Sequence, residues 1–306
     1  MIIWKNRLAA PVVVAPMFLV SGPDLVIETC ASGLIGTFPA LNQRTNEGYG
    51  AWLSEIEERL PVTAAPFGVN LIVHKTNSRL AKDVEITVQH RVPIVITSLG
   101  AVPDVIAAVH SYGGLVFHDV ISIRHAHKAA EAGVDGLFAV CAGAGGHAGT
   151  LNPFAFVAEI RQFFSKTLIL SGAITNGRQI AAARMLGANL AYLGTRFINT
   201  RESLAPEAYK QMIIDSTAKD IVYTSAISGV HANFLRNSII ASGADPDNLK
   251  EGAKLDMSSE HEFKVWRDIW SAGHGVSDIH DVPSTRELCA RLVSEYHEAI
   301  ADSQHL

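Results

Sequence analysis

Residues 167–196 read TLILSGAITNGRQIAAARMLGANLAYLGTR and contain the repeating unit that decides the fold. A short apolar run, TLILSGA (167–173), leads into an alanine-rich helical segment, GRQIAAARMLGA (177–188), and then into a second apolar run, LAYLGTR (190–196). Gly187 stands where a helix would end before the second run. Runs that are apolar throughout, rather than alternating, are typical of parallel strands buried on both faces. The stretch therefore predicts two parallel strands joined by a helix.

The same alternation of short apolar runs and amphipathic helical segments fills residues 1–200. Six further strands are predicted at VVVAPM (12–17), LIGTFPA (34–40), FGVNLIV (67–73), PIVITSLG (93–100), GLVFHDV (114–120) and GLFAVCA (136–142). Eight strands with seven intervening helices predict a (β/α)8 TIM barrel of the α/β class. A doubly wound sheet is the alternative, but it usually has fewer strands and a phosphate loop after the first one. The continuation VVVAPMFLVSGP contains no GxGxxG motif.

The pattern changes after residue 200 and divides the chain into three parts. Residues 1–200 are predicted to form the barrel core. Residues 201–280 are more polar and less periodic, so we expect an elaborated segment that covers the active face and shapes the substrate pocket. Residues 281–306 contain a final amphipathic helix (285–301), which we expect to pack back on the barrel.

Composition excludes several classes of protein. The chain has 306 residues with 25 Lys and Arg against 30 Asp and Glu, a formal net charge of −5, and no block of like charge. Nucleic acid and anionic membranes are therefore not expected partners. The three widely spaced cysteines form no CxxC pair, which suits a reducing cytoplasm. The apolar run 8–20 is interrupted by prolines and is shorter than the about 20 residues that span a bilayer.

Small residues at the ends of the last two predicted strands indicate an anion site. Ser171, Gly172 and Ala173 end one strand, and Gly194 and Thr195 end the next. Backbone N–H groups and a hydroxyl at this position of a barrel commonly bind phosphate. The glycines could also serve only to turn the chain.

Further candidates lie at other strand ends, each with a structural explanation beside the functional one. The loop Ala15-Pro16-Met17 could lie against a ring, or Met17 could fill a gap in the core. The Asn70 side chain could form hydrogen bonds to the edge of a ligand ring, or it could form them only to the backbone of a loop. His147, in CAGAGGHAG (141–149), suits a general base, or it could bond only to the backbone. The other histidines lack metal-ligand spacing, so no metal is predicted.

Taken in order, five motifs resemble the FMN-dependent nitronate monooxygenases, formerly called 2-nitropropane dioxygenases. These motifs are APM (15–17), GVN (68–70), AGGHAG (144–149), SGA (171–173) and GTRF (194–197). The match covers residues 1–200 and, more loosely, TSAISGVHANFLRN (224–237). The resemblance implies a TIM barrel with FMN across the carboxyl ends of the strands.

The resemblance also implies roles for individual residues. Ala15, Pro16 and Met17 would contact the flavin ring, Asn70 would bond near it, and Gly145 would lie against it. Ser171, Gly172, Ala173, Gly194 and Thr195 would hold the phosphate. His147 would be the catalytic histidine, with Gly146 beside it at the substrate. Apart from these carried-over roles, the stretch 224–237 could place Ser228 or His231 near the substrate, or these residues could belong to a structural turn around Gly229.

Two positions depart from the family pattern. The family usually has Gly-Gly where this chain has Gly172-Ala173, a mild change because the backbone N–H remains. Many members have a lysine where this chain has Asp119. A carboxylate is unfavourable near a phosphate or an anionic flavin, so we predict that Asp119 bonds the ribityl chain.

The leading functional hypothesis is oxidation of alkyl nitronates by FMN, with O2 restoring the flavin. His147 would bind the nitro oxygens or remove the α-proton of a nitroalkane. The alternative is an NAD(P)H-dependent reductase on the same barrel, acting on quinones or resembling the flavin-containing enoyl-acyl-carrier-protein reductases. A third reading is a flavin-binding barrel that is not an enzyme. A homo-oligomer is compatible with the sequence, which carries no direct signal for one.

Overall fold

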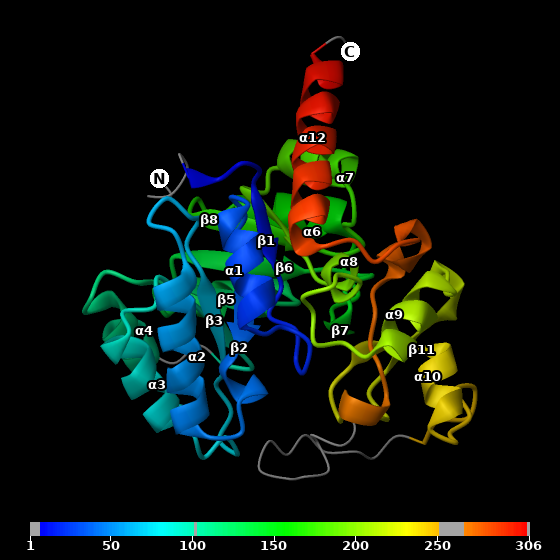
Figure 1. Ribbon diagram of the computed structural model, residues 1–306, viewed down its shortest axis with the longest axis horizontal. Coiled ribbons are helices and arrows are strands. Elements are labelled where there is room, and N and C mark those ends of the chain that lie inside the picture. Colours follow the sequence, from blue (N-terminus) through cyan, green and yellow to red (C-terminus); the bar gives the residue numbers. More distant parts are fainter. Residues whose placement is uncertain (1–6, 101–102, 251–265, 305–306) are drawn as a thin grey trace.

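Eight parallel strands form the central sheet of the computed structural model, which describes residues 7–100, 103–250 and 266–304. Their order around the sheet is β1-β9-β8-β6-β5-β4-β3-β2. The strands are β1 (Val12–Val14), β2 (Thr37–Pro39), β3 (Gly68–Ile72), β4 (Ile94–Ser98), β5 (Leu115–Val120), β6 (Gly136–Val140), β8 (Thr167–Ser171) and β9 (Leu190–Leu193). The two ends of the sheet meet at a parallel bridge between Val13 and Ile35. The predicted (β/α)8 barrel is confirmed (Figure 1).

Two apolar layers explain why the strands are apolar on both faces. Side chains that point into the barrel form one buried cluster, which includes Ile96, Phe117, Phe138 and Ile169. Their neighbours along the strands point outward and pack against the helices in a second, larger cluster. Successive residues of a strand face opposite sides, so a barrel strand covered by helices needs apolar residues at nearly every position.

Helices cover the outside of the barrel. They are α1 (Pro23–Ala31), α2 (Asn46–Arg59), α3 (Leu80–Gln89), α4 (Pro103–His110), α5 (Ile123–Glu131), α6 (Pro153–Arg161) and α7 (Gly177–Met185). Polar residues cap several of them; for example, the Asn176 side chain accepts the Gln179 N–H at the start of α7. Among the described residues, no helix is long and apolar enough to cross a membrane.

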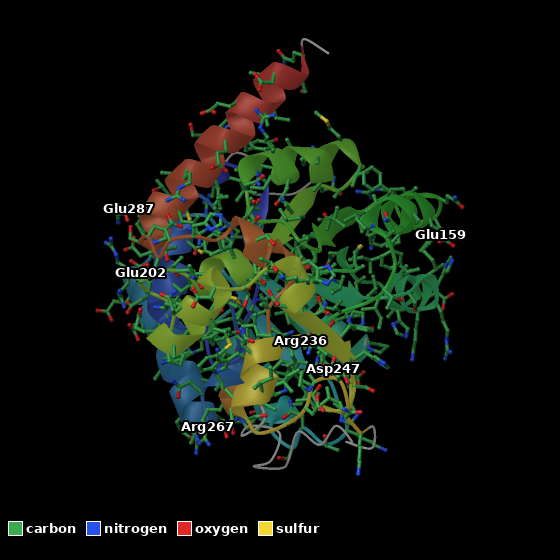
Figure 2. All side chains as sticks on the ribbon, turned by 90° about the vertical axis from the view of Figure 1, so that its right-hand side faces the viewer. Glu159, Glu202, Arg236, Asp247, Arg267 and Glu287 are labelled. Atoms are coloured by element: carbon green, nitrogen blue, oxygen red, sulfur yellow. The ribbon has the colours of Figure 1, made fainter. Side chains whose placement is uncertain are left out.

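The last helix, α12 (Thr285–Ser303), lies against α7 and α1. It begins with a capping box formed by Ser284 and Glu287. Glu202 accepts hydrogen bonds from both the N–H and the hydroxyl of Thr285, each at 2.7 Å. Glu202 and Glu287 therefore lie side by side at this helix start (Figure 2). This links the end of the chain to the segment that follows the barrel.

A small antiparallel sheet, which the sequence analysis did not predict, stands at the mouth of the barrel. It has the order β10-β11-β7 and consists of β10 (Ile221–Thr224), β11 (Ala232–Leu235) and β7 (Gly146–His147). In its register, His147 lies opposite Ala232 and Gly146 opposite Asn233. The short helices α8 (Thr195–Ile198), α9 (Glu207–Ile214) and α10 (Arg236–Ala241) complete this side of the molecule. The segment after residue 200 thus pairs directly with the glycine-rich loop after β6.

Candidate active site

A cavity of about 530 Å³ opens at the carboxyl ends of the barrel strands. This volume lies within the range of pockets that bind small molecules and cofactors. The cavity brings together all of the predicted site residues except Ser228. Those that line it are Ala15, Pro16, Met17, Asn70, Asp119, Gly145, Gly146, His147, Ser171, Gly172, Ala173, Gly194, Thr195 and His231.

Ser228 lies in a turn beside the cavity and not among the residues that line it. Its side chain is buried, and its hydroxyl donates a hydrogen bond to the Val230 carbonyl at 3.0 Å. Gly229 has a φ of 72°, in the left-handed region that glycine favours. The Ser228 hydroxyl therefore stabilises this turn, whereas His231 lines the cavity and stacks on Tyr223.

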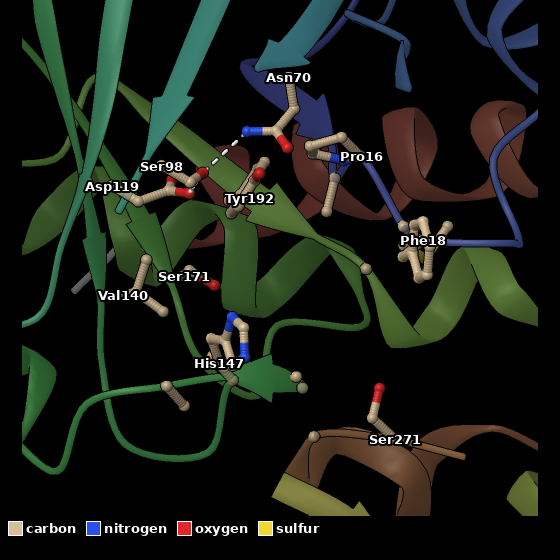
Figure 3. A pocket seen from close by; sticks show the side chains of 18 of the residues that line it. Pro16, Phe18, Asn70, Ser98, Asp119, Val140, His147, Ser171, Tyr192 and Ser271 are labelled. Atoms are coloured by element: carbon tan, nitrogen blue, oxygen red, sulfur yellow. Dashed lines mark hydrogen bonds between the residues drawn. The ribbon is translucent and has the colours of Figure 1, made fainter. Parts of the chain in front are cut away.

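His147 projects from β7 into the cavity (Figure 3). Its Nε2 atom is buried and has no hydrogen-bond partner among the described residues. Burial lowers the pKa of His147 to about 4, so the imidazole is neutral at neutral pH. Its ring makes a T-shaped contact with Trp266, with 5.2 Å between the ring centroids and an angle of 86° between the planes. The ring is thus held by packing, and the hydrogen-bonding capacity of its buried Nε2 is satisfied by no described residue.

The glycine-rich loop before His147 is shaped partly by the chain itself. The Asn233 side chain of β11 donates to the Ala144 carbonyl at 2.7 Å. A Cβ atom on Gly145 would come within 2.9 Å of the Gly273 nitrogen, closer than real Cβ contacts. A side chain at Gly145 would therefore clash with residues 272–273 whether or not a ligand is present. This second requirement could not be inferred from the sequence, because Gly145 and Gly273 are distant along the chain.

Asp119 stands at the end of a chain of hydrogen bonds across three neighbouring strands. Asn70 of β3 donates to the Ser98 hydroxyl of β4 at 2.8 Å, and Ser98 donates to Asp119 Oδ2 at 2.6 Å. Figure 3 shows these three side chains together at the cavity wall. Asp119 Oδ1 is buried without a partner among the described residues.

Burial raises the pKa of Asp119 to about 6, although the Ser98 hydrogen bond opposes that shift. Burial and the nearby Asp119 carboxylate also raise the pKa of the Tyr192 phenol. The sequence analysis missed Ser98. Its position as a polar residue at the carboxyl end of an apolar strand was the available signal.

The predicted anion site has an unusual backbone. Gly172 has a φ of 136°, and a Cβ atom there would lie 2.8 Å from the Ala142 carbonyl oxygen. The adjacent Ala173 adopts a φ of 54°, which is strained for a residue with a side chain. Strained residues of this kind concentrate at ligand sites. Ala173 thus adopts a left-handed backbone conformation despite its methyl group.

Thr195 begins α8 directly after β9, and Gly194 precedes it without a side-chain cap. The Thr195 hydroxyl oxygen accepts the Gly273 N–H at 2.9 Å, so its own hydrogen remains available to a ligand. Gly275 also lines this corner, and a Cβ atom there would meet Thr175 at 2.4 Å. The contribution of Gly273 and Gly275 was not foreseen from the sequence.

A (β/α)8 barrel with a cavity, a buried neutral histidine and a corner of exposed backbone at the strand ends has the organisation of a barrel enzyme. The profile of the family described as nitronate monooxygenase matches residues 2–295. The chain belongs to this family and is therefore an oxidoreductase.

Individual relatives agree with this assignment. The chain is 29% identical to a nitronate monooxygenase of Paraburkholderia phytofirmans, over 95% of this chain and 93% of that protein. Among solved structures it is similar to nitroalkane oxidase from Streptomyces ansochromogenes, with a TM-score of 0.83, 23% identity, and coverage of 97% and 99% of the two chains. FabK from Thermotoga maritima has a TM-score of 0.81 at 21% identity, with 99% and 98% covered. At these identities the two structures establish the shared fold.

Proposed function

We propose that this protein oxidises alkyl nitronates with FMN as its cofactor and O2 as the final electron acceptor. The observation that carries the proposal is His147, a neutral imidazole at the cavity whose buried Nε2 has no hydrogen-bond partner among the described residues. The same cavity contains the strained turn at Gly172-Ala173. Family membership and the nitronate monooxygenase relative support the same substrate class.

The residues of the cavity fit FMN. Backbone N–H groups at Gly172, Ala173, Gly194 and Thr195 would hold the phosphate, together with the hydroxyl groups of Ser171 and Thr195. The unpartnered Oδ1 atom of Asp119 would accept a hydrogen bond from the ribityl chain. Ala15, Pro16, Met17, Asn70 and Gly145 would contact the ring system. When bound, FMN supplies the two-electron acceptor that side chains lack.

The chemistry of the chain's own residues then centres on His147. Because the imidazole is neutral above about pH 4, its Nε2 can take the α-proton from a nitroalkane. In the other tautomer, Nε2–H donates to the anionic oxygen of a nitronate. Trp266 packs against this imidazole in a T-shaped contact. Gly146, with a φ of 68°, leaves the approach to this atom free of side chains.

A second candidate, an NAD(P)H-dependent reductase of quinones or enoyl thioesters, is favoured by the apolar part of the cavity. Phe18, Leu41, Ile72 and Val140 line it, and they offer more apolar surface than a short nitronate needs. We propose a cytoplasmic setting for either reaction, since all three cysteines are buried free thiols.

Absorbance spectra of the purified protein test these proposals. Bound FMN gives a yellow protein, and anaerobic mixing with ethylnitronate is expected to bleach the flavin, with colour returning when O2 is admitted. Bleaching by NADH but not by ethylnitronate would instead establish the reductase. A protein that takes up no FMN would contradict both enzymatic proposals.

A further inference from the structure

The cavity continues past the proposed FMN site to the outer side of β5 and the adjoining face of α5. This extension, which we call the β5–α5 arm, is lined by His118, His125 and Lys128 together with Leu99 and Ile121. None of these residues has a role in the proposed oxidation of short nitronates.

Three basic side chains gather in the β5–α5 arm. His118 is 7% exposed, and its Nδ1 atom bonds the Thr97 hydroxyl at 2.7 Å. Its Nε2 atom has no hydrogen bond within the described residues. His125 and Lys128 lie three residues apart on α5 and therefore share one face of the helix. Burial is the main cause that lowers the pKa of His118, and His125 and Lys128 add to it through their charge, which places them near its ring.

The charge of the arm is carried by Lys128. Within the described ranges, Lys128 forms no ion pair with a carboxylate. Asp119 follows His118 in the strand and points to the opposite face, into the barrel. The arm and the Asp119 network thus belong to different sides of β5.

The walls of the arm are apolar. Leu99 adopts a φ of 65° and is 38% exposed, and Ile121 is 37% exposed. The turn at Leu99 is fixed by Gly100, because a Cβ atom there would lie 2.8 Å from the Val73 carbonyl oxygen. A left-handed leucine whose side chain faces a cavity is the kind of strain that proteins retain at ligand sites. An apolar chain could therefore lie along these walls.

We propose that the β5–α5 arm binds the anionic terminal group, a phosphate or a carboxylate, of an elongated substrate whose apolar chain passes Leu99 and Ile121. Lys128 supplies the charge, while His118 and His125 supply hydrogen bonds to the anionic oxygens. The inference rests on the proposed function only in placing the reactive end of that substrate at His147. The site itself depends on residues outside the FMN corner.

Calorimetric titration of the FMN-loaded protein with octyl phosphate, octanoate and 1-octanol tests the arm directly. We expect at least one of the two anions to bind about tenfold or more tightly than the alcohol, because a charge-assisted hydrogen bond contributes that much. Lys128→Gln and His125→Gln should remove the advantage of the anion. The matched control is Lys82→Gln, since Lys82 is an exposed lysine paired with Glu85 on α3.

The two anions distinguish a phosphate-bearing from a carboxylate-bearing substrate. Equal binding of all three ligands, or an anion preference that survives Lys128→Gln, would overturn the inference. Oxidation of ethylnitronate, which is too short to reach the arm, is measured in parallel and should be unchanged in Lys128→Gln. If the wild type does not oxidise ethylnitronate but binds the anion in a Lys128-dependent manner, the proposed function is refuted and the arm is supported. If the wild type oxidises ethylnitronate but shows no preference for the anions over the alcohol, the proposed function is supported and the arm is refuted.

Discussion

At the scale of single residues, burial drives both titratable groups beside the proposed flavin site toward their neutral forms. It lowers the pKa of His147 to about 4 and raises the pKa of Asp119 to about 6. Removal from water disfavours the charged form of either group. His147 is therefore available as a base at neutral pH, whereas Asp119 changes its charge at about pH 6.

His147→Gln is expected to keep FMN bound and to lower kcat/KM for nitroethane by about a hundredfold or more, the usual contribution of a positioned base. In the wild type, kcat/KM should fall as pH decreases through about 4, where the imidazole becomes protonated. Steady-state kinetics across pH, with flavin absorbance as the measure of cofactor content, check both expectations. His90→Gln, at an exposed pair with Glu57, is the control. Unchanged turnover in His147→Gln would contradict the assigned role.

Asp119→Asn should stabilise the apoprotein at alkaline pH. Because the folded-state pKa is raised, the native protein binds the proton more tightly than the unfolded chain, and wild-type stability falls as pH rises from about 4 to about 6. Asparagine does not ionise, so the variant should gain about 2–3 kcal/mol at pH 8 and nothing below pH 4. Urea unfolding at both pH values measures this. The exposed Asp302→Asn should stay within about 0.5 kcal/mol of wild type. Parallel pH profiles for Asp119→Asn and wild type would show that Asp119 is not the titrating group.

At the scale of elements, the sequence predicted the eight barrel strands but extended several of them too far. The run 12–17 ends as a strand at Val14, and the run 190–196 ends at Leu193. Beyond β1, residues 15–17 line the cavity, and beyond β9, Gly194 leads into α8 at Thr195. The strands β7, β10 and β11 were missed because β7 has only two residues, in a run of glycines, and pairs with a segment far along the chain.

Gly145→Ala should weaken FMN binding by about tenfold, because an added methyl group would displace Gly273 and with it the partner of Thr195. Flavin fluorescence on titration of apoprotein measures the Kd. Gly50→Ala is a matched control in α2, where the nearest atom to the added methyl group is 3.7 Å away. It should leave FMN affinity unchanged and stabilise the fold by about 0.5–1 kcal/mol. Equal FMN affinity in both variants would show that the Gly145 contact is not needed by the site.

At the scale of the whole molecule, a charged cluster joins the barrel to the last helix. The Arg196 side chain of α8, 3% exposed, contacts Asp281 Oδ1 at 2.5 Å, and Arg291 of α12 contacts Asp281 Oδ2 at 2.7 Å. The sequence predicted a final helix on the barrel without indicating how it is attached. No local pattern links Arg196 to Asp281, since they lie 85 positions apart.

Arg196→Met should reduce the free energy of unfolding by about 2–4 kcal/mol, less than a fully buried pair would lose because Asp281 is partly exposed. Chemical denaturation followed by circular dichroism measures the loss. Arg178→Met removes an exposed pair with Asp302 and should change stability by less than about 0.5 kcal/mol. Similar small losses in both variants would mean that the Arg196 cluster does not anchor the C-terminal part.

The pairing of β7 with β11 has a consequence for the order in which the protein can mature during translation. Every barrel strand precedes residue 200, so the barrel can begin to assemble before the rest of the chain leaves the ribosome. His147, however, gains its strand partner Ala232 only after β11 has been synthesised. A nascent chain that has emerged as far as β9 would therefore contain the strand-end turns at Gly172 and Gly194 while its histidine loop still lacked that pairing. Acquisition of activity should lag behind acquisition of the barrel.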